Sequence, residues 1–328
     1  MMEERIKPGI SILLPVYNGF GFVETSVSSI LKQSFSNFEL LIIDDDSTDN
    51  SLKYLLSLRD ERIRIFTNKE NKGLFFNLNF LIQKCEAPLI KLWSQDDIMN
   101  NCCIEKIIEF HKKHPQIGFS YSGRDIINEK GEIISTDFID MTPEIVDRPL
   151  HSKIAFFTGS IAGNISNVTI TKNALKKTGL FDESMKISGD FDMWVRIAEN
   201  FPIGYIKDHL VQLRNHKGQL SMQKKYYINH LEEDFKVYQY LLNYLSEQER
   251  IEGKTILRSH KLLFYYTLML KAFFKGSIAK GFDFLKTLNK FDNFWILSFY
   301  FFKNRIIFRK RFANMQGDNT EFIKSEVK

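Results

Sequence analysis

The chain has 328 residues, of which 44% are hydrophobic and 26% charged, and its net charge is +5. This length allows one large α/β domain with a helical addition, or two modest domains. Three cysteines, Cys85, Cys102 and Cys103, exclude a disulfide framework and a paired-cysteine metal site, so we expect a reducing cytoplasm. The polar first residues do not resemble a signal peptide, so none is expected. The sequence has no run of 18 apolar residues, so no membrane-spanning helix is expected either.

Charge is unevenly distributed along the chain. Residues 222–328 hold 19 Lys and Arg against 11 Asp and Glu, whereas the first 221 residues are slightly acidic. This change predicts a boundary near residue 221. We expect an α/β domain over residues 1–221, in halves of about 1–125 and 126–221, and then a helical, basic, aromatic-rich extension over residues 222–328.

Apolar segments with two different periodicities alternate through the first half of the chain. They predict strands over 10–16, 38–43, 62–66, 88–93 and 117–121, and helices over 22–32, 52–56, 73–84 and 103–111. Such alternation is typical of βαβ units, so we expect a Rossmann-like, mostly parallel sheet flanked by helices.

The second half carries weaker signals. Asn128–Gly131 predicts a turn between short strands, and a helix is expected to begin at or just before Asp190. Two short strands are expected over 203–206 and 210–213, and helices follow beyond residue 222.

Two predicted strands end in acidic clusters, Asp44–Asp46 and Asp96–Asp97. In open α/β sheets ligands bind beyond the carboxyl ends of the strands, so the two clusters should share one crevice. Gathered carboxylates repel one another unless a cation compensates them, and a hard divalent ion with phosphate ligands does this. The alternative is that these aspartates only form turns and helix caps.

Four segments make the chain resemble the family 2 glycosyltransferases, which have the GT-A fold. They are Leu14-Pro-Val-Tyr-Asn18, Phe38-Glu-Leu-Leu-Ile-Ile-Asp-Asp-Asp-Ser-Thr-Asp49, Trp93-Ser-Gln-Asp-Asp97 and Gly189-Asp-Phe-Asp-Met-Trp-Val-Arg196. The resemblance covers roughly residues 8–221. It implies an inverting, bacterial surface-glycan type of enzyme, a hexosyl- or related transferase.

The resemblance also implies a nucleotide site. Pro15, Tyr17 and Asn18 would bind the nucleotide beside Asp45, whose carboxylate would accept the imide N–H of uracil or thymine. Asp96 would bind the ribose or the diphosphate. The implied donor is a UDP- or dTDP-linked sugar, and the implied acceptor is a hydroxyl of a glycan or lipid-linked molecule.

By the same resemblance, Asp97 and His216 would bind a divalent metal, Mn²⁺ or Mg²⁺, and Asp190 would be the catalytic base. An ordinary structural role for His216 stays open. Three positions depart from the family pattern, and at the first of them Asp46 replaces the usual Gly. Ser94 stands where many members have the first Asp of the metal-binding motif, and Leu78 stands where an Arg is usual.

Other functions fit less well. A nucleotidyltransferase would show a basic Gly-rich loop near the start, and an NAD-dependent oxidoreductase would show GxGxxG after the first strand. A non-catalytic nucleotide-sugar-binding or scaffolding protein of the same fold remains the alternative.

The extension pairs an aromatic block, Phe294–Phe302, with Lys and Arg up to Arg311. One interpretation is peripheral attachment of residues 291–312 to the inner face of the cell membrane. The other is a helical cap that packs on the catalytic domain or on a second copy in a homodimer. Nucleic acid is not an expected partner, because the first domain is acidic and no nucleic-acid motif is present.

Overall fold

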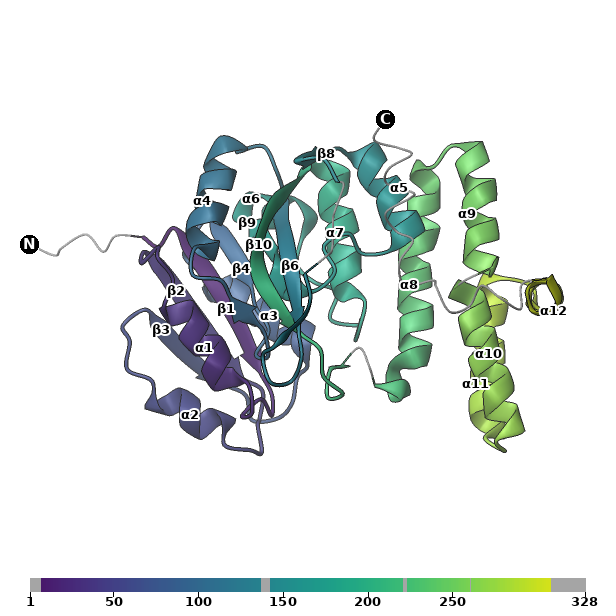
Figure 1. Cartoon of the computed structure of the whole chain (residues 1–328), viewed down its shortest axis with the longest axis horizontal. Helices are drawn as coiled ribbons and strands as arrows, with labels where there is room; N and C mark the ends of the chain where they lie inside the picture. Colours follow the sequence, from purple (N-terminus) through teal and green to yellow (C-terminus); the bar gives the residue numbers. More distant parts are fainter. Residues whose placement is uncertain (1–6, 137–141, 221–222, 260, 308–328) are drawn as a thin grey trace, which may run out of the picture. The chain divides into compact units, whose positions relative to one another are not determined.

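The computed structural model describes residues 7–136, 142–220, 223–259 and 261–307 (Figure 1). Its contacts divide the chain into two compact units. Unit 1 comprises Met1–Arg148 and Ala162–Gln219, and unit 2 comprises Pro149–Ile161 and Leu220–Lys328. A segment from the middle of the chain therefore groups with the C-terminal helices.

Within the described residues, unit 1 contains one ten-stranded sheet of order β3-β2-β1-β4-β9-β6-β10-β5, with β7 beside β6 and β8 beside β10. The strands are β1 (Ile10–Val16), β2 (Phe38–Asp44), β3 (Ile63–Thr67), β4 (Leu89–Leu92), β5 (Ile98–Met99), β6 (Phe119–Ile127), β7 (Ile133–Ser135), β8 (Ile145–Val146), β9 (Val168–Thr171) and β10 (Ile203–Arg214).

The expected parallel pairing holds for β3, β2, β1 and β4 and for β6 with β10. The remaining pairings are antiparallel, because β9, β5, β7 and β8 enter the sheet in the opposite direction. The fold is thus the α/β class that the alternation predicts, with a parallel first half and a mixed second half.

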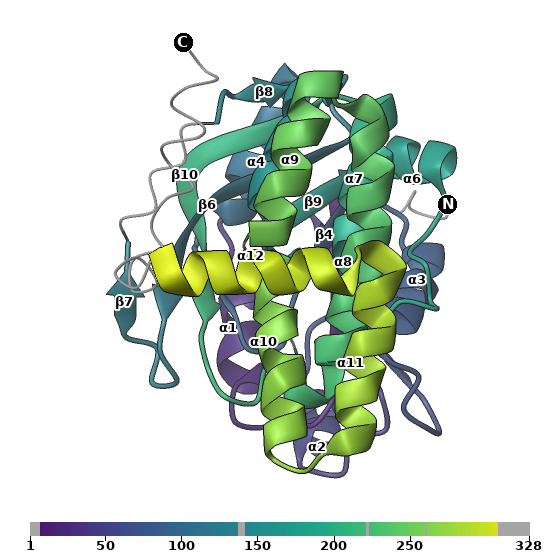
Figure 2. The ribbon, with the colours of Figure 1, turned by 90° about the vertical axis from the view of Figure 1, so that its right-hand side faces the viewer.

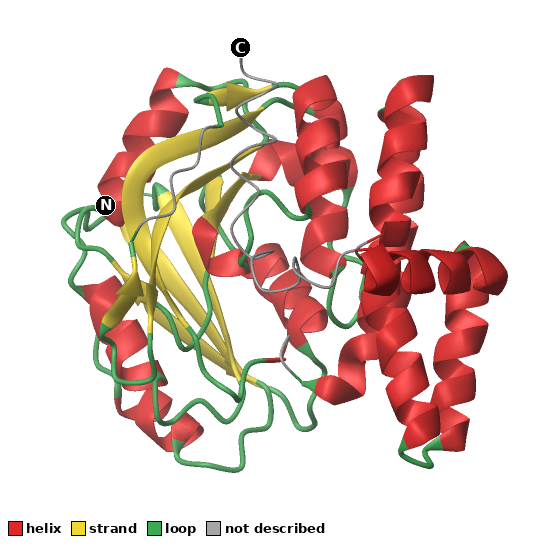
Figure 3. Cartoon of the chain, turned by 45° about the vertical axis from the view of Figure 1, so that its right-hand side comes forward, coloured by secondary structure: helices red, strands yellow, loops and turns green. Residues whose placement is uncertain are grey.

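The helices of unit 1 are α1 (Val23–Leu31), α2 (Ser51–Ser57), α3 (Leu74–Lys84), α4 (Cys103–Lys113), α6 (Lys172–Thr178) and α7 (Gly189–Asn200), with a short η1 turn (Ile165–Asn167). Alternate residues of β1, such as Ile12 and Leu14, join one buried core with α1, α2 and α4. Helix α3 contacts β1 and β2 outside that core, and Figure 3 shows helices on both faces of the sheet. Central strands buried on both faces explain the unbroken apolar runs of β1 and β2.

Two expected strands prove to be one. β10 runs through Ile203–Arg214, and its register against β6 shifts between Ile206 and Val211. The polar residues there interrupt the apolar pattern, but they form a bulge inside a continuous strand. The turn expected over Asn128–Gly131 does connect two strands, β6 and β7.

Unit 2 is helical. Its elements are α5 (Arg148–Thr158), η3 (Lys224–Tyr226), α8 (Tyr227–Leu241), η4 (Leu242–Tyr244), α9 (Glu247–Ser259), α10 (Lys261–Phe274), α11 (Ile278–Phe291) and α12 (Phe294–Ile307). Leu231, Met269, Phe284 and Leu297 are among the residues of its core. Figure 2 shows α12 lying across α10 and α11. None of the helices in the described parts of the chain is long and apolar enough to cross a bilayer.

Candidate active site

The carboxyl ends of the parallel strands meet at one edge of the sheet. Val16 of β1 is paired with Asp44 of β2, and β1 is also paired with β4. The loops that follow are joined directly. The Thr48 N–H donates to Asn18 Oδ1 at 2.8 Å, and the Asn18 N–H donates to Ser47 Oγ at 3.0 Å. The loop after β4 is joined through Gln95, whose side chain exchanges two hydrogen bonds with the backbone of Tyr17.

Left-handed backbone conformations shape two of these loops. Asn18 has a φ of 48° and Asp46 a φ of 64°. Asn and Asp tolerate this conformation better than other residues with a side chain. Asp46 can therefore replace the glycine that the family pattern has at this turn.

Asp45 is buried and tightly held. Its Oδ1 accepts from Asn68 Nδ2 at 2.7 Å and from the Lys72 N–H at 2.8 Å. Its Oδ2 accepts one bond, from the Gly73 N–H at 2.9 Å, and keeps the capacity for another. Asn68 also donates to Asn77 Oδ1 at 2.7 Å. These bonds fix the plane of the carboxylate, and Asn68 and Asn77 belong to no motif that the sequence shows.

The other residues that are expected to bind the nucleotide are less buried than Asp45. Pro15 is half-buried at the end of β1, while Tyr17 and Asn18 are exposed in the next loop. Leu78, at the position of the usual Arg, is fully buried, so it offers no polar contact.

Asp96 and His216 form a pair. His216 Nε2 lies 2.8 Å from Asp96 Oδ2, and the two side chains are 14% and 12% exposed. The Gly218 N–H donates to His216 Nδ1 at 3.2 Å, so Nε2 carries the proton that faces Asp96. Ser94 Oγ donates to Asp96 Oδ1 at 2.6 Å. The serine that replaces the usual first Asp thus orients the carboxylate that remains.

Asp97 is enclosed. It has no exposed surface, and its oxygens accept from Ser166 Oγ at 2.5 Å and from the Arg214 N–H at 2.8 Å. Burial, together with the neighbouring Asp96 charge, raises the pKa of Asp97 to about 8. Lys91 Nζ donates to the Ser166 carbonyl at 2.5 Å, and burial lowers the pKa of Lys91 to about 8. The expected contact of Asp97 with a metal stays a prediction.

Arg214 connects three segments of this region. Its Nε donates to the Asp96 carbonyl at 2.8 Å, and its Nη1 donates to the carbonyls of Asn128 and Glu129 at 2.9 Å each. The guanidinium also lies over the Phe22 ring, 4.9 Å from its centroid. The sequence does not single out Arg214, because a buried arginine has no distinctive spacing.

Asp190 lies in the first turn of α7, half-buried, and accepts from the Phe191 N–H at 2.8 Å. The helix begins here because Gly189 permits close packing: a Cβ at that position would meet the Phe75 ring at 2.8 Å. Asp192 binds Arg196 Nε at 2.7 Å, one helical turn later. Asp192 and Arg196 thus hold the helix, while Asp190 stands at its first turn.

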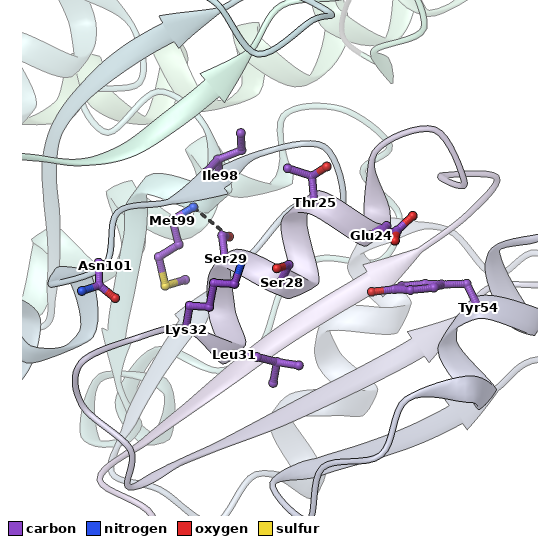
Figure 4. Close-up of a pocket in the computed structure, with 10 residues that line it drawn as sticks. All are labelled: Glu24, Thr25, Ser28, Ser29, Leu31, Lys32, Tyr54, Ile98, Met99 and Asn101. Atoms are coloured by element: carbon purple, nitrogen blue, oxygen red, sulfur yellow. Dashed lines mark hydrogen bonds between the residues drawn. The ribbon is translucent and has the colours of Figure 1, made fainter.

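A hollow of about 930 Å³ lies elsewhere in unit 1, against α1 (Figure 4). Its lining includes Glu24, Ser28 and Lys32 of α1, Tyr54 of α2 and Met99 of β5. None of the expected site residues lines it, so it is separate from the nucleotide site that the sequence predicts.

The donor set fits a loosely held divalent ion. No group of three or more His, Cys, Asp or Glu side chains in the described residues could hold a metal. Asp96 would offer a carboxylate oxygen, and His216 would offer Nε2 once its proton moves to Nδ1 in place of the bond from the Gly218 N–H. Mg²⁺ and Mn²⁺ sites with few protein ligands are completed by phosphate oxygens and water.

The chain is similar in sequence to known glycosyltransferases. The sequence profile of glycosyl transferase family 2 matches residues 11–170. An uncharacterized glycosyltransferase of Rickettsia felis is 29% identical over 248 residues, which are 75% of this chain and 40% of that protein. An Escherichia coli protein, UDP-Glc:alpha-D-GlcNAc-diphosphoundecaprenol beta-1,3-glucosyltransferase WfgD, is 36% identical over 119 residues, or 36% of this chain and 47% of that protein. The chain spans about two fifths of the first two Rickettsia relatives.

Among solved structures, residues 1–349 of Staphylococcus aureus TarS superpose with a TM-score of 0.62 at 18% identity, covering 85% of this chain and 80% of that one. The complex of TarS with UDP-GlcNAc gives a TM-score of 0.60 at 19% identity, covering 76% and 70%. These likenesses show the same GT-A fold. With the profile match and the glycosyltransferase relatives, they make this chain similar to the members of glycosyl transferase family 2.

Proposed function

We propose that the protein is an inverting glycosyltransferase that moves a sugar from a UDP- or dTDP-linked donor to a hydroxyl of a glycan or lipid-linked acceptor. The observation that carries the proposal is the Asp96–His216 pair, which lies at the same sheet edge as the fixed Asp45 carboxylate. The family supports a sugar donor. The TarS complexes with UDP and UDP-GlcNAc and the name of the WfgD relative support a uridine nucleotide and a lipid-linked acceptor.

The donor nucleotide is proposed to bind over the loops after β1 and β2. Asp45 Oδ2 would accept the imide N–H of the base, because that oxygen has remaining hydrogen-bonding capacity. Pro15, Tyr17 and Asn18 would border the base and ribose. The catalytic domain is proposed to lie within residues 1–221.

Asp96 and His216 are the proposed ligands of Mn²⁺ or Mg²⁺. We prefer Asp96 to Asp97 because the Asp97 carboxylate is enclosed and already accepts two hydrogen bonds. Asp97 would instead position the segment that carries Asp96. A bound divalent ion would neutralise negative charge on the leaving diphosphate.

Asp190 is the proposed general base. It would take the proton of the acceptor hydroxyl while that oxygen attacks the anomeric carbon opposite the diphosphate. A single displacement of this kind inverts the anomeric centre and needs no nucleophile from the protein.

The rival is a nucleotide-sugar-binding protein without catalysis. Hydrolysis of UDP-sugars with and without Mn²⁺, followed by acceptor screening, separates the two. Stabilisation by a donor without any turnover on a panel of acceptors would favour the binding protein, since a ligand that favours the native state raises the melting temperature whether or not it reacts.

A cytoplasmic location, a homodimer and contact of residues 291–312 with a membrane stay predictions. Residues 308–312 of that segment lie outside the described residues.

A further inference from the structure

Helix α12 has an inner apolar face that packs within unit 2. Leu297 is fully buried. The rings of Phe294 and Phe301 lie 5.7 and 5.2 Å from the Tyr266 ring of α10, and the Tyr266 hydroxyl is 2.8 Å from Ser298 Oγ. This face accounts for the attachment of α12 to unit 2.

The same helix has a second aromatic face, which the described residues leave exposed. Trp295, Phe299 and Phe302 are 77%, 63% and 59% exposed. Their spacing of four and three residues places them along one stripe of the helix. Exposed large rings gathered on one stripe mark an interaction surface, because leaving apolar area in water costs free energy.

The sequence of α10, α11 and the start of α12 carries an excess of positive charge. Between residues 261 and 303 the sequence has seven lysines and two aspartates. One of those aspartates, Asp292, is paired with Arg258. Exposed lysines include Lys271, Lys275, Lys280, Lys286 and Lys303. A helical unit that combines exposed aromatic rings with an excess of exposed lysines complements an anionic, partly apolar partner.

We infer that the Trp295–Phe299–Phe302 stripe is a docking face for an anionic lipid bilayer, with its rings at the level of the headgroups. Aromatic rings favour that layer, and each nearby basic residue strengthens the attraction to anionic lipid. The 14 residues of α12 extend about 21 Å, less than the hydrocarbon thickness of about 30 Å, so the helix lies on the surface. The inference adds to the proposed function a lipid surface beside which a lipid-linked acceptor would be met.

A second copy of the chain is the competing occupant. In a two-fold symmetric pair the same surface meets itself, so the lysines of one copy would face the lysines of the other. Like charges opposed in this way weaken association, whereas anionic lipid offers the opposite charge. The charge therefore favours the bilayer.

The protein contains its own reporter. Trp93 and Trp194 are fully buried in unit 1, so Trp295 is the exposed one of the three tryptophans. We expect vesicles of phosphatidylcholine with phosphatidylglycerol to shift the emission of Trp295 to shorter wavelength and to protect it from acrylamide. Vesicles of phosphatidylcholine alone should do so weakly, and added salt should reverse the effect.

Point variants test the face itself. Phe299→Ser with Phe302→Ser should weaken sedimentation with anionic vesicles by at least about tenfold, since two buried rings contribute well over 1.4 kcal/mol. The matched control is Ile133→Ser with Ile134→Ser, which removes two exposed apolar side chains from β7. The control should bind as the parent does.

Three outcomes overturn the inference. They are an unchanged Trp295 signal on anionic vesicles, equal losses in both double variants, and protection of Trp295 that rises with protein concentration when no lipid is present. The last outcome would identify a dimer face. UDP-sugar hydrolysis without vesicles should be the same in the parent and in the Phe299→Ser, Phe302→Ser variant. If the parent itself neither hydrolyses nor transfers, the proposed function fails while the docking result stands.

Discussion

The ends of β2 and β4 use aspartates in two different ways. At the end of β2, Asp45 is held by backbone N–H groups of residues 72 and 73 and retains an oxygen with spare capacity. At the end of β4, Asp97 is held by the Arg214 N–H and Ser166 and is fully enclosed, while Asp96 before it meets His216. One acid of the second pair thus anchors the loop and the other remains for a ligand.

The difference shows how neighbouring acids divide their roles. Asp96 lies in a turn and Asp97 directly follows it, and their two carboxylates point to different partners. At β4 one direction leads into the interior, where Ser166 and Arg214 supply hydrogen bonds. An acidic pair in a sequence therefore predicts one ligand and one anchor as readily as it predicts two ligands.

The largest expected effect concerns a third acid. Asp190→Asn should lower transfer about 10²–10⁴-fold, the usual range for a lost general base, and leave UDP binding nearly unchanged. Calorimetric titration of UDP and initial rates on the true acceptor measure both. Asp192→Asn is the control on the same helix, because it breaks the Arg196 pair and should affect stability more than rate. Near-normal turnover in Asp190→Asn would remove the assignment.

The comparison of Asp96 with Asp97 is tested by their separate variants. Asp96→Ala should remove most of the Mn²⁺-dependent gain in UDP affinity, whereas Asp97→Asn, which keeps the shape of the anchor, should cost about 10–100-fold at most, as outer-shell changes do. Titrations of UDP with and without Mn²⁺ decide between them. A larger loss in Asp97→Asn would return the metal to Asp97.

A change at Asp45, at the end of β2, should weaken nucleotide binding equally with and without a metal. Asp45→Ala should weaken UMP and UDP alike, by roughly 10–100-fold for a lost hydrogen bond to a charged group. UMP titration with and without Mn²⁺ provides the measurement. A loss that appears only with UDP and Mn²⁺ would mean that Asp45 acts at the diphosphate and not at the base.

A smaller expected effect is a dependence of stability on pH, which involves one histidine in each unit. Burial lowers the pKa of His111 in unit 1 and of His151 in unit 2 to about 4. In the unfolded chain the two histidines take up protons below about pH 6.5, whereas in the folded chain they stay neutral down to about pH 4. The contribution of each neutral histidine to the free energy of unfolding is therefore fully present above about pH 6.5 and is lost as the pH falls towards 4. At pH 5 each contributes a loss of about 2 kcal/mol. Denaturant unfolding at pH 7 and pH 5 should show a smaller difference in His111→Gln, and an unchanged difference would contradict the assignment.

Much of the fold follows from the sequence, because strands buried on both faces leave unbroken apolar runs. The predicted elements up to α4 begin and end within two residues of their expected bounds, whereas β6 runs six residues beyond its predicted end and the sequence does not predict β5. The sequence does not predict which residues hold the carboxylates of the site in place. Ser166, Asn68 and Asn77 contribute hydrogen bonds from outside the acidic motifs, and no spacing in the sequence indicates such contacts. The different surroundings of Asp96 and of the fully enclosed Asp97 likewise depend on residues far away in the chain, His216 and Ser166.

The position of α5 has a consequence for how the chain is made. This helix leaves the ribosome well before α8 and α9, yet its Phe156 packs so closely against Gly253 that a methyl group there would meet the ring at 2.2 Å. The Phe156 ring also lies 5.7 Å from the Tyr238 ring. Until those partners are synthesised, α5 presents an uncovered apolar side to chaperones or to other nascent chains. A gene fragment that stops after Gln219 would carry the same uncovered helix permanently, so it should be prone to aggregation even with its sheet intact.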